Sequence, residues 1–134
     1  VLFRSDAFLE DFNEAYEIVL EATGKAPDIY RFPGGSVNDY NEKTRDDIIA
    51  EMDRRGFTYF DWNVDSNDWQ GYGWTTLYTN VLKDAEEFSS PVILFHNTGD
   101  RDNTVLVIED IIKALKNKGY KFGSLSQKIK PVQF

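Results

Sequence analysis

Cysteine is absent from this chain of 134 residues, and histidine occurs once, at His96. The lack of cysteine excludes disulfides, thiolate zinc sites and cysteine nucleophiles. A single histidine excludes any metal site that needs two histidine ligands from this chain. No apolar run approaches the roughly 18 residues that a membrane-spanning helix requires, so we expect no membrane span.

Positive charge is also scarce, because 15 Lys and Arg residues face 23 Asp and Glu residues, for a formal net charge of −8. An acidic surface repels phosphate groups, which argues against nucleic acid or anionic lipid as a partner and favours a neutral or cationic substrate. The segment 1–4 is too short for a signal peptide, so an exported form would already have lost its leader. The composition is 41% apolar and 15% aromatic, which suits one folded domain.

Helical and strand-like patterns alternate along the chain. Apolar residues at helical spacing predict helices over 6–24, 44–56, 75–88 and 104–117, each ending near a glycine or a polar turn. Runs rich in aromatic and β-branched residues predict strands over 28–32, 57–64, 92–96 and 120–125. This order predicts an α/β fold with about four parallel strands. A closed (β/α) barrel needs about eight strands, so the chain is either a small open sheet or part of a larger barrel.

Polar residues gather where three of the predicted strands end, which is where parallel α/β folds place active groups. Arg31 precedes the run Phe32-Pro33-Gly34-Gly35, the run 61–69 carries several carboxylates, and His96 opens the run 96–100. Arg31 has a simpler interpretation as a surface ion pair. Pro-Gly-Gly is first of all a turn signal, although it also leaves the amide of Gly34 open to a ligand as an oxyanion donor.

His96 closes a strand that we expect to be buried, where a polar ring needs a hydrogen-bonding partner. A lone histidine is more often structural than catalytic. A carboxylate such as Asp68 would fix the tautomer of the ring and favour its charged form, which suits general acid catalysis. The stretch from Asp65 to Asp68 can equally be a capped turn.

Calcium binding is a rival interpretation of the same stretch. Asp61, Asn63, Asp65 and Asn67 follow the spacing that opens an EF-hand loop. The pattern then fails, because the sixth position is serine rather than glycine and the twelfth is tyrosine rather than glutamate. We therefore set calcium aside.

All three tryptophans fall within residues 62–74. Core packing is the ordinary role of such rings. Trp69, however, lies in a loop rich in glycine and aspartate, where a large ring is hard to bury. Flat aromatic rings beside carboxylates often form a platform for a sugar.

The ordered set Arg31-Phe32-Pro33-Gly34-Gly35, then Asp65-Ser66-Asn67-Asp68-Trp69, then Ile93-Leu94-Phe95-His96 resembles the last three of five motifs in polysaccharide deacetylases. These are the NodB-type enzymes of carbohydrate esterase family four. The resemblance covers essentially all of residues 1–134 and implies the C-terminal portion of a distorted (β/α) barrel. It implies removal of N- or O-acetyl groups from a polysaccharide such as peptidoglycan, a chitin-like polymer or xylan, at the cell surface or outside the cell.

The resemblance also implies roles for individual residues. Arg31 would orient the catalytic base, and His96, tuned by Asp68, would protonate the leaving amine. The other matching positions would bind substrate: the amide of Gly34 would hold the oxyanion, and Trp69 and Leu94 would line the acetyl pocket, with Pro33 and Gly35 shaping the turn. Two positions depart from the usual pattern, since Gly34 stands where many members have an aromatic residue and Asn97 where aspartate is common.

The family holds zinc or another divalent metal with residues of its first two motifs, and neither motif occurs in this chain. We therefore expect the chain alone to bind no catalytic metal and to release no acetate. An incomplete barrel exposes sheet edges and helix faces, so we expect the missing N-terminal half as a partner, or self-association and domain swapping in its place. Two alternatives stay open: a non-catalytic carbohydrate-binding or interaction module of the same fold, and an unrelated small α/β domain.

Overall fold

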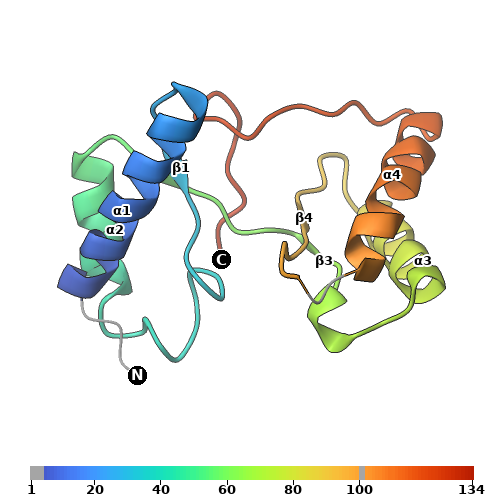
Figure 1. Cartoon of the computed structure of the whole chain (residues 1–134), viewed down its shortest axis with the longest axis horizontal. Helices are drawn as coiled ribbons and strands as arrows, with labels where there is room; N and C mark the ends of the chain where they lie inside the picture. Colours follow the sequence, from blue (N-terminus) through green and yellow to red (C-terminus); the bar gives the residue numbers. More distant parts are fainter. Residues whose placement is uncertain (1–4, 100–101) are drawn as a thin grey trace. The chain divides into compact units, whose positions relative to one another are not determined.

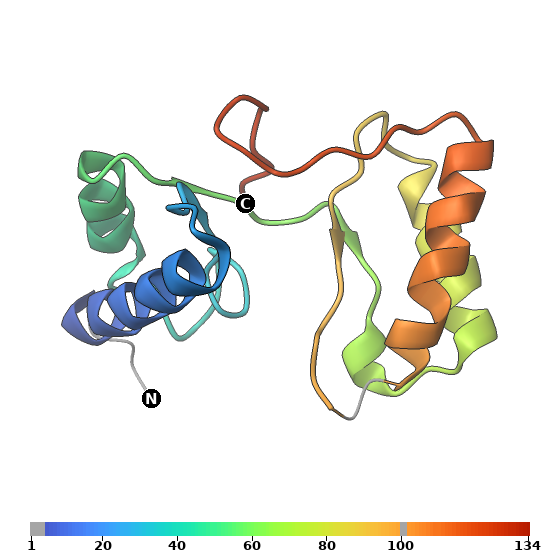
Figure 2. The same ribbon diagram turned by 45° about the horizontal axis from the view of Figure 1, so that its top comes forward.

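The computed structural model describes residues 5–99 and 102–134, and these form two compact units. The first unit comprises residues 5–61 together with 125–134, and the second comprises the described residues from 62 to 124. Each unit has its own short parallel strand pair, its own two helices and its own apolar core (Figures 1 and 2).

The first unit consists of α1 (Ser5–Thr23), β1 (Ile29–Tyr30), α2 (Arg45–Arg54) and β2 (Thr58–Tyr59). The two strands run parallel, with Ile29 opposite Thr58 and Tyr30 opposite Tyr59. Gly24 ends α1 in the left-handed conformation, with φ +68°, which glycine adopts at little cost. The core of this unit lies between its helices and strands and consists of Phe8, Tyr30, Phe32, Ile48 and Met52.

The second unit consists of β3 (Val64–Asp65), the 3₁₀ turn η1 (Asp68–Gln70), α3 (Trp74–Ala85), β4 (Ile93–Leu94) and α4 (Asp102–Asn117). β3 and β4 are parallel, with Val64 opposite Ile93. The helices α3 and α4 lie side by side in both views and bury one apolar face each (Figures 1 and 2). The buried residues of this core are Val64, Leu77, Val81, Ala85, Val107, Ile111 and Leu115.

All four predicted helices are present, with bounds within a few residues of those expected. The predicted strand over 57–64 is wrong in part, because the run divides into β2 and β3, which belong to separate two-stranded sheets. The break falls at Asp61, whose N–H donates to the carbonyl of Val132 at 2.7 Å. Asn63 then turns to the other sheet, where its side chain accepts from the N–H of Val92 at 2.7 Å.

The predicted strand over 120–125 is also wrong, because the structure has no strand there. Tyr120 instead caps the end of α3, where its hydroxyl donates to the carbonyls of Ala85 and Phe88 at 3.2 and 3.0 Å. Residues 125–134 belong to the first unit and form no strand. There the side chain of Gln127 donates to the carbonyl of Asp28 at 3.0 Å, and that of Gln133 donates to the carbonyl of Tyr59 at 3.1 Å.

The α/β class with parallel strands is therefore confirmed. The four strands pair two by two in the part of the chain that the structure describes, and a barrel is not among the features seen there. None of the described helices has the length and apolar character needed to cross a membrane.

Candidate functional site

The second unit brings Asp68 and His96 into direct contact. Asp68 begins η1, directly after Asn67, which takes the left-handed conformation with φ 53° that asparagine tolerates better than most residues. The carboxylate of Asp65 accepts from the N–H of Asn67 at 2.9 Å and so fixes this sharp turn. His96 follows β4, the parallel neighbour of β3. The paired strands thus carry both side chains to the same end of one small sheet.

The carboxylate of Asp68 accepts three hydrogen bonds. Its Oδ1 atom lies 2.7 Å from Nδ1 of His96, while Oδ2 accepts from the N–H of His96 and from the hydroxyl of Thr104, both at 2.8 Å. The Asp68 side chain is fully buried, whereas the His96 side chain is 34% exposed. With Nδ1 facing the carboxylate, Nε2 is the ring nitrogen that can meet a ligand.

Burial by itself raises the pKa of the Asp68 carboxyl group, because a charge is costly away from water. The hydrogen bonds from the N–H and ring of His96 and from Thr104 outweigh that effect and hold the pKa of Asp68 below its usual value. Asp68 is therefore a carboxylate at neutral pH.

Aromatic rings lie close to this pair in the sequence. Trp69 follows Asp68 directly and is 55% exposed, as its loop position predicts. Trp74 and Tyr78 stack one turn apart on α3, with ring centroids 5.0 Å apart and planes 7° apart. Leu94 is half-buried in β4. The second unit therefore presents flat apolar rings as well as an acid–base pair.

The first unit carries the remaining candidate residues. Arg31 follows β1, and its guanidinium donates to the carbonyl of Phe32 at 3.1 Å. The N–H of Gly35 donates to the same carbonyl at 2.9 Å, which closes a tight turn over Pro33 and Gly34. Gly34 has φ +74° and Gly35 has φ +88°, conformations in which a side chain would be strained.

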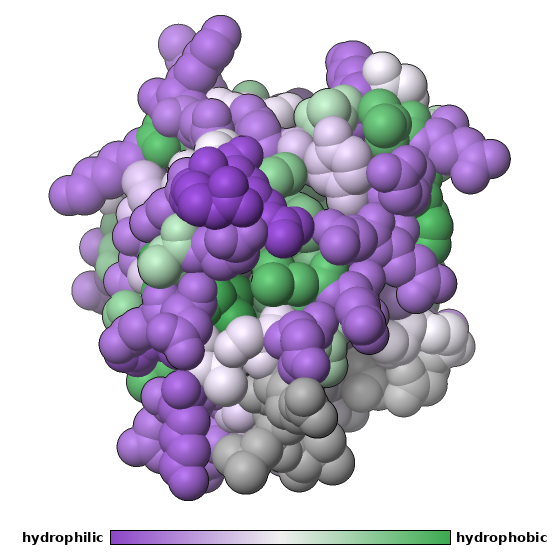
Figure 3. Space-filling model, turned by 90° about the vertical axis from the view of Figure 1, so that its left-hand side faces the viewer, coloured by the Kyte–Doolittle hydropathy of each residue, from purple (hydrophilic) through white to green (hydrophobic). Residues whose placement is uncertain are grey.

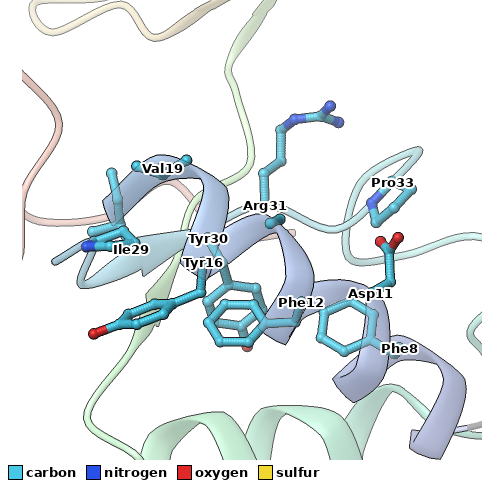
Figure 4. Close-up of a pocket in the computed structure, with 11 residues that line it drawn as sticks. Phe8, Asp11, Phe12, Tyr16, Val19, Ile29, Tyr30, Arg31 and Pro33 are labelled. Carbon is cyan, nitrogen blue, oxygen red and sulfur yellow. The ribbon is translucent and has the colours of Figure 1, made fainter. Parts of the chain in front are cut away.

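Arg31 and Pro33 also line a hollow of about 230 Å³ between α1 and β1 (Figure 4). The wall from α1 follows helical spacing and includes Phe8, Asp11 and Phe12, and the other wall comes from β1 and the residues on either side of it. Hydrophilic side chains predominate on the face that Figure 3 shows, and apolar surface occupies a smaller area near its centre. The hollow is apolar in its floor and has opposite charges, Asp11 and Arg31, at its rim.

Several residues that sequence reasoning missed hold these candidates in place. Thr104 anchors Asp68, and Ser36, Asn38 and Asn41 bind around the Pro-Gly-Gly turn. The sequence shows only that these four residues are polar. It does not show their hydrogen-bonding partners, which lie as far as 36 residues away along the chain. Asp61 accepts from the N–H and hydroxyl of Ser36, so this first residue of the calcium-like run is already occupied by donors. Asp100, in the run after His96, lies outside the described residues.

The candidate residues thus form two local groups, Arg31 to Gly35 in the first unit and Asp68, Trp69, Leu94 and His96 in the second. No group of three His, Cys, Asp or Glu side chains suited to a metal ion occurs within residues 5–99 and 102–134. The described donors therefore do not fit the zinc or other divalent metal that the sequence resemblance implies.

Known proteins resemble the chain along nearly its whole length, although no family model matches it. YheN of Bacillus subtilis (strain 168), whose name places it among polysaccharide deacetylases, is 33% identical over 129 residues, which are 92% of this chain and 43% of YheN. A peptidoglycan-N-acetylglucosamine deacetylase of Bacillus cereus is 29% identical over 127 residues, which are 90% of this chain and 44% of that protein.

The catalytic domain of a peptidoglycan N-acetylglucosamine deacetylase from Eubacterium rectale has the same fold, with a TM-score of 0.89 and 28% identity over 98% of this chain. The chain is therefore similar to polysaccharide deacetylases in both sequence and fold. It spans less than half the length of the curated deacetylases above and 61% of the solved domain. A pseudoenzyme of carbohydrate esterase family 4 from Bacillus anthracis shares the fold, with a TM-score of 0.71 and 21% identity.

Asp68 makes the stability of the fold depend on pH. Because its folded-state pKa is lowered, Asp68 stabilises the fold fully above its unfolded pKa of about 3.9, and this contribution is lost as the pH falls through the folded value. Asp68→Asn should lower the free energy of unfolding by about 1–3 kcal/mol near pH 6, and the difference from wild type should shrink toward pH 3.

Tryptophan fluorescence during urea unfolding measures this difference, because all three tryptophans lie in the second unit. Asp84→Asn, an exposed residue on α3, is the matched control and should show no such dependence. A difference in the free energy of unfolding between wild type and Asp68→Asn that grows as the pH falls would contradict the stabilising role of the Asp68 carboxylate.

Proposed function

We propose that the protein to which this chain belongs is a metal-dependent hydrolase that removes N- or O-acetyl groups from a polysaccharide. The observation that carries this proposal is the Asp68–His96 pair, which stands in a chain similar to polysaccharide deacetylases. Peptidoglycan is the substrate that the relatives' names favour, and chitin-like polymers and xylan are the other candidates. Action on peptidoglycan would place the protein at the cell surface or outside the cell.

His96 is the proposed general acid. Removal of an acetyl group from an amine requires a proton on the leaving nitrogen, and a partly exposed imidazole can deliver it from Nε2. Asp68 contacts the opposite ring nitrogen, where its charge stabilises the imidazolium and keeps the ring from rotating. Thr104 and the backbone of His96 keep the carboxylate itself in place.

The residues of the turn in the first unit have proposed roles in charge stabilisation. The exposed N–H of Gly34 would donate to the oxyanion that forms when the acetyl carbonyl is attacked, and Arg31 would orient the catalytic base. Pro33 and Gly35 give the turn its shape. Trp69 and Leu94 would line the pocket for the acetyl group, with Trp69 exposed to the sugar.

The rest of the catalytic domain is the proposed partner of the hollow between α1 and β1. Among the described residues β1 pairs on one side only, with β2, so a neighbouring strand can add to its other edge. The Eubacterium rectale domain has a further portion that this chain does not match. Where that portion is absent, a second copy of the chain could cover the same surface through self-association or domain swapping.

A non-catalytic carbohydrate-binding module is the second candidate function. The exposed ring of Trp69 and the stacked rings of Trp74 and Tyr78 favour it, since aromatic surfaces bind sugars without any chemistry. The likeness of this chain to the Bacillus anthracis pseudoenzyme concerns the fold only. Sugar binding without acetate release in the completed domain would favour this candidate.

Acetate release tests the proposed function. The chain alone should bind no stoichiometric zinc and should release no acetate from an acetylated chito-oligosaccharide or from peptidoglycan. The chain joined to the remaining portion of a deacetylase domain, here called the completed domain, should do both. Elemental analysis and an acetate assay measure the two properties. Release of acetate by the chain alone, with stoichiometric zinc, would contradict the expectation that both properties require the remaining portion of the domain.

His96→Ala in the completed domain tests the acid role. Loss of a general acid lowers turnover by about 10²–10⁴-fold. The zinc content should stay near that of wild type, because His96 is assigned to proton transfer and not to the metal. Asn117→Ala, an exposed residue at the end of α4, is the control and should retain turnover. Loss of zinc in His96→Ala would contradict the acid role and indicate a ligand role.

A further inference from the structure

The turn after β1 presents one backbone amide to the outside. The bond from the N–H of Gly35 to the carbonyl of Phe32 closes a four-residue turn in which Pro33 is second and Gly34, with φ +74°, is third. Proline followed by a residue with positive φ is the signature of a type II turn. Gly34 is exposed, and no group in the described part of the chain accepts a hydrogen bond from its N–H.

The side chain of Asn38 binds the two carbonyls of this turn. Its amide nitrogen donates to the carbonyl of Pro33 at 3.2 Å and to that of Gly35 at 2.8 Å, which uses both of its N–H groups. Its oxygen accepts from the N–H groups of Tyr40 and Asn41, at 2.8 and 3.1 Å. This arrangement also sets the orientation of the amide, since the reverse would direct its oxygen at two carbonyl oxygens.

The bond to Pro33 determines where the N–H of Gly34 points. The two groups belong to one peptide unit, and in a planar trans peptide the carbonyl and the N–H face opposite ways. A type I turn differs from a type II turn by a flip of this same peptide. Asn38 holds the carbonyl on its own side, so the N–H of Gly34 faces away from it. Asn38 also packs closely here, because a side chain at Gly34 would begin 3.4 Å from its amide nitrogen.

A separate contact anchors the far end of the turn. The buried carboxylate of Asp61 accepts from the N–H and the hydroxyl of Ser36 at 2.8 and 2.6 Å, and from the N–H of Phe134 at 2.8 Å. Ser36 follows Gly35 directly, so Asp61 fixes the position of the turn without contacting the peptide between Pro33 and Gly34. The position of the turn and the direction of that peptide therefore depend on different side chains.

We propose that Asn38 is a positioning residue that holds the Pro33–Gly34 peptide so that the N–H of Gly34 can donate to the reaction's oxyanion. The proposal rests on the deacetylase function above for the identity of the acceptor, while the effect of Asn38 on the peptide stands independently of it. An amide fixed before the reaction needs no reorganisation when charge develops, which is the source of its catalytic value.

Two variants test the proposal. Asn38→Asp keeps the oxygen that Tyr40 and Asn41 bind but replaces the donor to both carbonyls with a second oxygen, and Asn38→Ala removes the donor without adding charge. Asn13→Asp adds the same charge at an exposed position on α1, where the side chain contacts Arg55 instead of the turn, and is the control.

The first readout uses this chain and needs no activity. Amide NMR spectra of both Asn38 variants should show shifted Gly34 and Gly35 signals, while the Ser36 amide keeps its slow hydrogen exchange because Asp61 still binds it. The control should resemble wild type. Unchanged Gly34 and Gly35 signals would overturn the proposal, and so would fast exchange at Ser36 in both variants, which would indicate loss of the whole turn.

The second readout is the kinetics of the completed domain. Both Asn38 variants should lower kcat roughly tenfold or more and leave KM within about twofold, because the oxyanion exists only after attack on the substrate. A rise in KM alone, or an unchanged kcat, would overturn the proposal. If wild type releases no acetate, the proposed function fails, and the NMR readout alone then decides whether Asn38 orients the amide.

Discussion

The second unit depends on one buried carboxylate. Asp68 accepts from the ring and the N–H of His96 and from the hydroxyl of Thr104, and so joins η1, the end of β4 and the first turn of α4. A buried charge without partners would be strongly unfavourable, so these three segments must meet at Asp68 for the unit to fold. The contact that stabilises the unit is therefore the same contact that orients the imidazole.

The first unit solves a similar problem with an amide side chain, Asn38, and a second buried carboxylate, Asp61. The turn after β1 exposes backbone groups near Arg31. Asn38 donates hydrogen bonds to two carbonyls of this turn, and Asp61 accepts one from the N–H of Ser36, which follows the turn. Preorganisation of this kind lets each group of candidate residues form within its own unit. A chain that spans only part of the length of its deacetylase relatives can thus carry two prepared groups of residues, while the proposed activity requires the rest of the domain.

The sequence supported the helices best, because their apolar spacing is long and regular. Predictions from the sequence were less accurate for the strands, which are short. Over 57–64 the residue types favour a strand throughout, yet Asp61 turns out of the sheet to bind Ser36 and Val132, contacts that no local pattern reveals. Tyr120 likewise favours a strand by type but is held by two carbonyls near the end of α3.

The Asp68–His96 contact could be anticipated because the chain has one histidine, because both residues follow predicted parallel strands, and because a buried ring needs a partner. Asn38 and Thr104 could not, since asparagine in a polar loop and threonine near the start of a helix are common everywhere. Their importance comes from distant or turn-specific partners that exist only once the chain has folded. The roles of Arg31, Gly34 and Trp69 stay predictions that follow from the family.

Asp68 holds His96 so that Nε2 faces outward. The ¹⁵N chemical shifts of the two ring nitrogens, measured on the neutral ring, report this orientation. The neutral ring should carry its proton on Nδ1, bonded to Asp68, and leave Nε2 unprotonated. A neutral ring protonated on Nε2, or one that exchanges freely between both forms, would contradict it.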